Sequence, residues 1–113
     1  MHLRDQIRAA LTPELVRPGF EGSHRMSGHC YVASEAYFHL AGGKVAGLVA
    51  RRIKHEGVTH WWLEDRDGNV IDLTAEQFYA SVPYHKGRST GFLTRRPSKR
   101  AQIVIDRVKA ASC

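Results

Sequence analysis

Three residue types that together can activate a sulfur nucleophile follow one another along the chain. Cys30 lies at the expected start of a helix, His60 opens a run typical of a strand, and Asp72 lies in the next such run. A helix N-terminus and a nearby imidazolium both favour the thiolate form of a cysteine. We therefore expect Cys30 to be a nucleophile, His60 to pair with its thiolate and later protonate the leaving group, and Asp72 to orient the ring of His60.

Each of these three residues also has a purely structural explanation. A cysteine inside a cell is often a small buried apolar residue, and a histidine in a strand is usually structural. Asp72 could simply support the helix that begins near Thr74. The order and spacing of the three residues, and the face that they can share, favour the catalytic interpretation.

The register of one hairpin decides whether His60 and Asp72 can meet. A two-residue turn at Asp67-Gly68 would place them on opposite faces of the sheet. A three-residue turn over 66–68, with glycine in the left-handed conformation, leaves them on one face, with Cα atoms about 7–8 Å apart. This second register also gathers the apolar residues on the other face: Trp61, Leu63, Ile71 and Leu73. We therefore predict the three-residue turn.

Apolar spacing, capping residues and a glycine pair predict the other elements. Helices are expected over residues 3–11 and from Cys30 to Ala41, where Gly42-Gly43 ends the second one. The remaining elements are strands over 45–53, 58–64 and 70–73, a short helix from Thr74 through Tyr79 with a Thr74/Gln77 capping box, a loop over 81–97, and a helix capped by Ser98 whose apolar stripe is Ala101, Val104, Ile105, Val108 and Ala111. This order predicts one α+β domain over 1–113, in which the helix carrying Cys30 packs on a small antiparallel sheet and a further helix ends the chain.

Alternation along the second strand assigns the two tryptophans to different faces. Trp61 is expected in the core, and Trp62 on the active-site side, where it could wall a cleft. Tyr84, in the long loop, is the candidate for the opposite wall. The backbone amide of Cys30 is available to an oxyanion, and no second donor is identified.

Positive charge is concentrated near the end of the chain. The formal net charge is +6, and from Lys86 onward eight Lys/Arg stand against one acidic residue, Asp106. The basic patch that we single out consists of Arg88, Arg95, Arg96, Lys99 and Arg100. Such a patch can attract nucleic acid or an acidic protein surface, or it can be a solvated helix face with a basic approach to it.

Composition and cysteine usage narrow the class of protein. Apolar residues make up 42% and charged residues 25% of the chain, which is ordinary for a globular protein. No stretch approaches the ~20 apolar residues of a membrane span, and Cys30 and Cys113 form no disulfide framework, so a cytoplasmic setting is expected. Ligand pairs at zinc-site spacing and nucleotide-binding loops do not occur in the sequence, so we expect no metal and no cofactor.

The segment that runs from Cys30 through His60-Trp61-Trp62 to Asp72-Leu73-Thr74 resembles the core of transglutaminase-like enzymes, within the wider class of papain-like cysteine hydrolases. The resemblance implies an α+β fold with a helix packed on an antiparallel sheet. It also implies a Cys-His-Asp triad at Cys30, His60 and Asp72. His24 lies in the loop where papain-like enzymes often place an oxyanion side chain, which makes it a further candidate.

The chain as a whole is similar to small uncharacterised proteins of bacteriophages and prophages, through residues 28–36, 60–63, 72–78 and 97–101. That similarity implies a setting in the host cytoplasm. We expect a cysteine-dependent acyl-transfer enzyme that acts on an amide, isopeptide or thioester bond of a protein, peptide or small acyl substrate. The rival expectation is a non-catalytic phage protein that binds nucleic acid or an acidic host protein through the basic patch.

Overall fold

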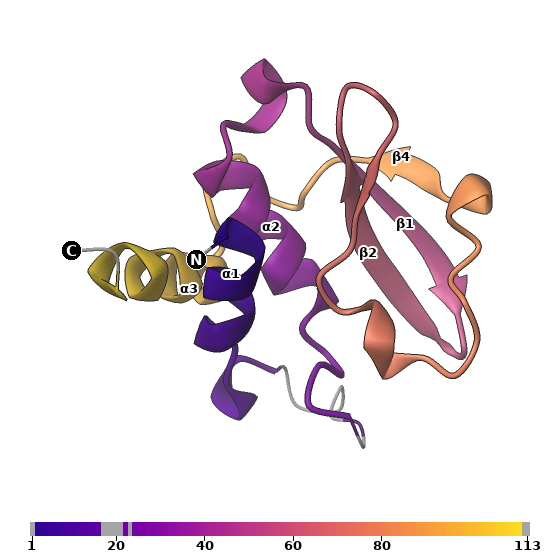
Figure 1. Ribbon diagram of the computed structural model, residues 1–113, viewed down its shortest axis with the longest axis horizontal. Helices are drawn as coiled ribbons and strands as arrows, with labels where there is room; N and C mark the ends of the chain where they lie inside the picture. The colour runs from indigo at the N-terminus through magenta and orange to yellow at the C-terminus, as the bar shows by residue number, and fades with distance from the viewer. Residues whose placement is uncertain (1, 17–21, 23, 112–113) are drawn as a thin grey trace.

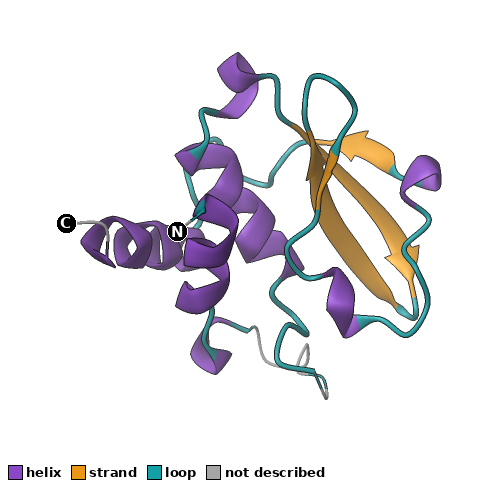
Figure 2. Ribbon diagram, viewed as in Figure 1, coloured by secondary structure: helices purple, strands orange, loops and turns teal. Residues whose placement is uncertain are grey.

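Helices lie on one side of the molecule and an antiparallel sheet on the other in the computed structural model, which describes residues 2–16, 22 and 24–111 (Figures 1 and 2). The helices are α1 (Leu3–Ala10), α2 (Cys30–Leu40) and α3 (Lys99–Ala111). The strands are β1 (Val49–His55), β2 (Val58–Glu64), β3 (Val70–Ile71) and β4 (Arg88–Thr90), in the sheet order β3-β2-β1-β4. The predicted α+β class is confirmed, with α2 beginning at Cys30 and α3 as the C-terminal helix.

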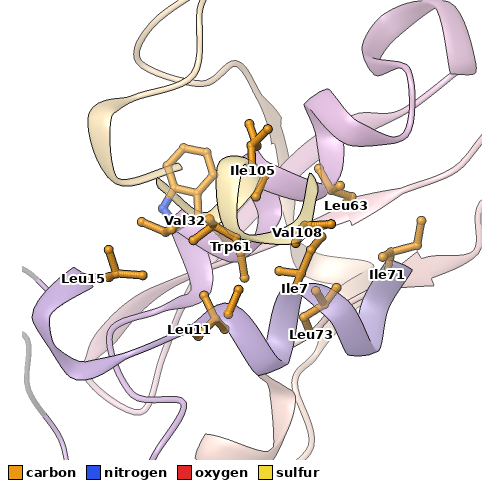
Figure 3. Packing of buried hydrophobic residues seen from close by; sticks show 14 of the residues in the cluster. Ile7, Leu11, Leu15, Val32, Trp61, Leu63, Ile71, Leu73, Ile105 and Val108 are labelled. Atoms are coloured by element: carbon orange, nitrogen blue, oxygen red, sulfur yellow. The ribbon is translucent and has the colours of Figure 1, made fainter. Parts of the chain in front are cut away.

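The hairpin between β2 and β3 has the register that the apolar pattern predicts. Leu63 pairs with Ile71 and Glu64 with Val70, and Gly68 has a φ of 81°. The turn therefore spans residues 66–68, and the predicted apolar face is buried in the core: Trp61, Leu63, Ile71 and Leu73 (Figure 3). The strand after the turn is shorter than the predicted 70–73, because the chain bends at Asp72, whose carboxylate accepts a hydrogen bond from the Thr74 amide.

The hairpin between β1 and β2 corrects the predicted strand over 45–53. Its turn is Glu56-Gly57, with φ values of 48° and 82°, as a two-residue turn of the mirror-image type requires. The strand runs to His55, and residues 43–46 before it form a 3-10 turn between two glycines with positive φ. The predicted strand over 45–53 therefore includes the end of a 3-10 turn and most of a strand, because the apolar residues in this segment follow neither a helical nor a strand period.

The core lies between the helices and the inner face of the sheet (Figure 3). The apolar stripe of α3 is buried at Ala101, Val104, Ile105 and Val108, as predicted. Ala111 is exposed, so its assignment to the stripe is wrong. Residues 109–111, at the end of α3, are exposed, and this end of the helix projects past the other helices (Figure 1).

Ser98 caps α3 as predicted, and a buried carboxylate supports the cap. The Ser98 hydroxyl accepts a hydrogen bond from the Ala101 amide at 3.2 Å. Glu35, which is fully buried on α2, accepts hydrogen bonds from the Ser98 amide at 2.9 Å and from its hydroxyl at 2.7 Å. This contact fastens the start of α3 to the helix that carries Cys30.

The segment 81–97 is not one long loop, as the sequence predicts, since it contains a 3-10 turn over Tyr84–Lys86 and the strand β4. Arg51 of β1 fixes the segment by donating to the Gly87 carbonyl at 2.6 Å and to the Ser89 hydroxyl at 3.2 Å. The segment packs on Trp62, on the side of the sheet that faces away from the helices.

The segment after Asp72 also differs from the prediction. Residues Ala75–Gln77 form a 3-10 turn, and the Thr74 side chain makes no capping bond to it. The Gln77 amide donates to the Thr74 carbonyl and hydroxyl instead of reaching the Thr74 amide, which Asp72 already holds. No helix in the described part of the chain combines the length and the apolar character needed to cross a bilayer.

Candidate active site

His60 and Asp72 form a buried pair at the centre of the candidate site. His60 is fully buried, and its Nε2 lies 2.6 Å from Asp72 Oδ2. Because an ionised carboxylate only accepts hydrogen bonds, we assign the shared proton to Nε2, and in this tautomer Nδ1 is the acceptor nitrogen. The Nδ1 atom is buried and has no hydrogen-bond partner among the described residues. Asp72 therefore orients the ring, and Nδ1 is the ring nitrogen that has no partner among the described residues.

Aromatic rings fix the plane of the His60 imidazole. Trp62 stacks beside it with ring centroids 5.8 Å apart, and Phe78 meets it edge-on at 4.7 Å. Phe78 was not singled out from the sequence. The sequence gives no indication of this contact with His60, because it depends on how the chain turns after Asp72.

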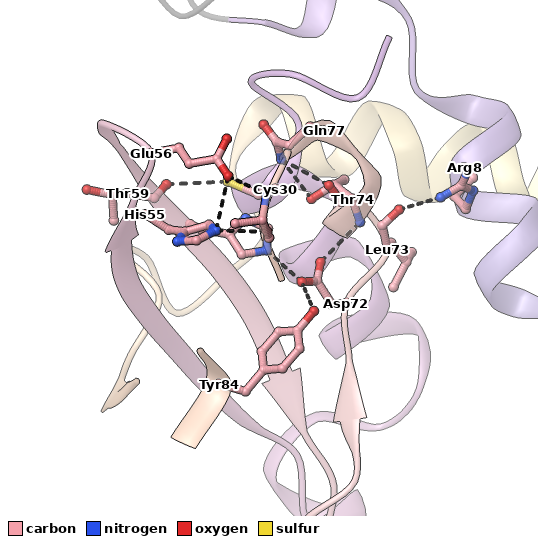
Figure 4. Close-up of polar contacts among 12 residues, drawn as sticks. Arg8, Cys30, His55, Glu56, Thr59, Asp72, Leu73, Thr74, Gln77 and Tyr84 are labelled. Atoms are coloured by element: carbon pink, nitrogen blue, oxygen red, sulfur yellow. Dashed lines mark hydrogen bonds and ion pairs between the residues drawn. The ribbon is translucent and has the colours of Figure 1, made fainter. Parts of the chain in front are cut away.

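Asp72 accepts hydrogen bonds from three different groups (Figure 4). Oδ2 receives the His60 ring and, at 2.8 Å, the hydroxyl of Tyr84; Oδ1 receives the Thr74 amide at 3.1 Å. Burial, followed by this bond and the charge of Asp72, raises the pKa of Tyr84 well above its usual value, so its hydroxyl remains a donor. Tyr84, predicted as a cleft wall, is thus a positioning residue behind the His60–Asp72 pair.

We expect Tyr84→Phe to slow any reaction of Cys30 that uses His60 by about 10-fold or more, since a hydrogen bond to a charged carboxylate contributes about 1.5–3 kcal/mol. The variant keeps the ring that packs against Trp62, at 5.2 Å between centroids. The measurement is the rate of Cys30 alkylation by iodoacetamide as a function of pH. The matched control is Tyr79→Phe, because Tyr79 is fully exposed, and an equal loss in both variants would contradict the positioning role.

Cys30 lies at the first position of α2, against the edge of β2 that β3 leaves open. Its Sγ is 3.6 Å from the carbonyl oxygen of Thr59, and its sulfur also receives the backbone amide of Trp61. Thr59 and Trp61 are the two neighbours of His60 in the chain, so the sulfur lies alongside the strand position that carries the imidazole. In the part of the chain that the structure describes, no hydrogen bond joins the sulfur to His60.

The thiol of Cys30 is held in its protonated form. Burial raises the pKa of Cys30 to about 11 and outweighs the backbone amides of Trp61, Tyr31 and Cys30 itself, while the charge of Asp72 raises it further. The residue keeps some exposed surface, but its sulfur is largely surrounded by protein. The expected resting thiolate is therefore replaced by a neutral thiol that donates to Thr59, because burial outweighs the helix N-terminus.

A pocket of about 660 Å³ opens over Cys30. Its walls include Tyr31, Trp61 and Phe78, and its charged lining residues are Arg52, Glu56 and Arg100. The predicted wall Trp62 is fully buried and does not line this pocket. Trp61 is packed in the core, as predicted, but it also lines the pocket. Trp62 lies on the His60 side of the sheet, as predicted, and packs against the His60 ring instead of lining the pocket.

His24 is not placed as an oxyanion donor to Cys30. It is exposed, and its Nδ1 accepts a hydrogen bond from the Met26 amide at 3.0 Å, which closes a local turn. It does not line the pocket that contains Cys30. The His24 ring therefore bonds to the backbone amide two residues further along the chain and not to a group near the Cys30 sulfur.

The residues of the basic patch are dispersed rather than gathered. Arg88 lies on β4, Arg95 and Arg96 lie in the following loop, and Lys99 and Arg100 are in the first turn of α3. Only Arg100 lines the pocket with Cys30, and Arg95 lines a separate pocket at the C-terminal end of α2. Arg52, which was not predicted as a site residue, joins Arg100 at the pocket because the Glu56-Gly57 turn pairs it with Trp61.

A family model described as YunG protein matches residues 3–112. The chain belongs to the YunG family. No protein with a curated description and no solved structure matches it. All three candidate catalytic residues of this YunG-family protein lie inside the matched region, and its function is inferred below from its own geometry.

Proposed function

We propose that this YunG-family protein is a cysteine-dependent acyl-transfer enzyme with Cys30 as nucleophile, His60 as general base and acid, and Asp72 as the residue that orients His60. The observation that carries the proposal is the state of the His60 ring. Its Nε2 is fixed by Asp72 at 2.6 Å while its Nδ1 is buried with no partner among the described residues. A buried polar atom without a partner is costly, and a catalytic role is one of the explanations for such an atom in a folded protein.

The reaction begins from a neutral pair of thiol and imidazole. As the Cys30 sulfur attacks the carbonyl carbon of an amide, isopeptide or thioester, its proton passes to His60 Nδ1. Asp72 stabilises the imidazolium. The tetrahedral adduct then expels an amine or thiol, which takes the proton from Nδ1, and leaves an acyl thioester on Cys30. Water or an amine attacks this thioester with Nδ1 again accepting the proton, and the Cys30 thiol is restored.

Backbone amides supply the oxyanion donors for this mechanism. The amide of Cys30 is at the start of α2, and the amide of Trp61 already bonds to the Cys30 sulfur from the open edge of β2. Both amides are fixed by the fold before substrate binds, which is the property that makes such donors effective. Trp61 is thus our candidate for the second donor that the sequence did not identify.

The test is the pH dependence of Cys30 alkylation by iodoacetamide, followed by peptide mass spectrometry. Since the pKa of the thiol is raised to about 11, alkylation of the free thiolate should rise up to about that pH. In the wild type, we expect His60 to add reactivity at neutral pH, and His60→Ala to lower that rate at least about 10-fold. The two profiles should converge at high pH, where the base is not needed.

The matched control for this test is His85→Ala, because His85 is an exposed histidine outside the candidate triad. We expect its profile to equal that of the wild type. Equal rates at neutral pH for the wild type and His60→Ala would contradict the proposal. A reducing, cytoplasmic setting belongs to the same proposal, because Cys30 must remain a free thiol.

A second candidate function is binding of nucleic acid or an acidic protein by the basic patch. It is favoured by the exposure of Arg88, Arg95, Arg96 and Lys99, which form no ion pair within the described part of the chain. This function predicts binding that weakens steeply with salt and does not change in Cys30→Ala. Electrophoretic mobility shifts over a salt series would measure it.

A further inference from the structure

The pocket over Cys30 carries uncompensated positive charge. Two guanidinium groups, those of Arg52 and Arg100, line it together with one carboxylate, that of Glu56. The oxygens of Glu56 already accept the amides of Tyr79 at 3.1 Å and Ala80 at 2.8 Å. Glu56 forms an ion pair with His55 and with neither arginine.

Arg52 lies close to a second positive charge, that of Arg88. The Arg52 guanidinium lies over the ring of Trp61, 5.6 Å from the ring centroid. On the neighbouring strand Arg88 is directly opposite Arg52, and like charges in that relation repel each other. Neither Arg52 nor Arg88 forms an ion pair with an acidic residue in the part of the chain that the structure describes. A bound anion would relieve this repulsion.

The two arginines line the same pocket as the Cys30 sulfur. In the proposed mechanism, backbone amides hold the oxyanion, which leaves the guanidinium groups for another part of the substrate. The aromatic rings of Tyr31, Trp61 and Phe78 line the pocket with them.

We propose that the acyl group accepted by Cys30 carries a carboxylate, joined to the reacting carbonyl through an apolar stem. The stem packs on the aromatic wall that Tyr31, Trp61 and Phe78 provide, and the carboxylate binds Arg52 and Arg100. Planar guanidinium groups suit a carboxylate because they can donate two parallel hydrogen bonds to it. This inference rests on the proposed function, since it names the substrate class of the same site.

The experiment compares two series of maleimides that alkylate Cys30 in a Cys113→Ser background. Each maleimide carries an alkyl chain of increasing length that ends either in a carboxylate or in the corresponding primary amide. The same ratio of carboxylate rate to amide rate is measured for glutathione, a thiol without a pocket. At one chain length, we expect the ratio for Cys30 to exceed the ratio for glutathione about 3- to 10-fold. The excess should shrink as the salt concentration is raised.

Arg52→Gln and Arg100→Gln are each expected to lower this ratio about 2- to 5-fold. Arg52→Lys should restore only part of it, because the charge remains but the two parallel donors of the guanidinium group are lost. The matched control is Arg4→Gln, an exposed arginine on α1 that does not line the pocket, and it should leave the ratio unchanged.

A ratio equal to that of glutathione at every chain length, or one that neither arginine variant lowers, would overturn the inference. Maleimide adds to the Cys30 thiolate, and each ratio compares two maleimides on the same protein at the same pH, so the extent of deprotonation cancels from the ratio. The charge preference is therefore measured even if Cys30 never forms an acyl-enzyme. Failure of the substrate class and failure of the proposed function are thus read from separate experiments.

Discussion

A Cys30→Ala variant is expected to form no acyl-enzyme and to lose acyl transfer by about 10⁴-fold or more, since it removes the atom that bonds to the substrate. In the wild type, an activated thioester should add one acyl group to Cys30, visible as a mass increase of the intact protein. Peptide mapping should place that group on the peptide that contains Cys30. His60→Gln should form the same adduct, but about 10²- to 10⁴-fold more slowly.

The matched control for this prediction is Cys113→Ala, which removes the other cysteine of the chain and should leave the rate unchanged. Cys113 lies outside the described residues. Acylation that persists at full rate in Cys30→Ala, or that moves to Cys113 without loss of turnover, would contradict the assignment of the nucleophile.

Trp62→Ala is expected to lower the free energy of unfolding by about 3–5 kcal/mol, because it leaves a large cavity beneath the candidate site. The Trp62 ring has no exposed surface and lies between His60 and Tyr84, with ring centroids 5.8 Å and 5.2 Å away. Gly87 approaches the ring so closely that a Cβ at that position would have no room. Urea unfolding at neutral pH measures the effect.

The control for Trp62 is Tyr79→Ala, which removes another large aromatic ring from a fully exposed position. We expect its free energy of unfolding to stay within about 0.5 kcal/mol of the wild type. A Trp62→Ala variant as stable as Tyr79→Ala would mean that Trp62 is not part of the packed face. Trp62→Phe should recover part of the stability and keep His60 supported.

The meeting of His60 and Asp72 could be predicted from the sequence because local rules determine it. Side chains alternate along a strand, and a three-residue turn with Gly68 fixes which residues of the two strands share a face. Burying the apolar set that includes Trp61 and Leu73 leaves His60 and Asp72 together on the other face. The structure shows this register and the resulting hydrogen bond.

The ionisation of Cys30 could not be predicted in the same way. A position at a helix start favours a thiolate, but burial raises the pKa of Cys30 to about 11. The degree of burial depends on how α2 packs against the open edge of β2, which joins segments about 30 residues apart. The roles of Tyr84 and Arg52 were missed for a related reason, since one depends on the course of the segment 81–87 and the other on the Glu56-Gly57 turn.

The sequence by itself determined the α+β class, the cysteine at the start of a helix and the shared face of His60 and Asp72, because helix caps, alternation and turn length act over a few residues. Only the tertiary structure decided that the Cys30 thiol is neutral, that Trp62 is buried and Tyr84 holds Asp72, and that Arg52 and Arg100 line one pocket. Desolvation and the pairing of distant side chains depend on which segments pack together, and no local pattern of residues specifies that packing.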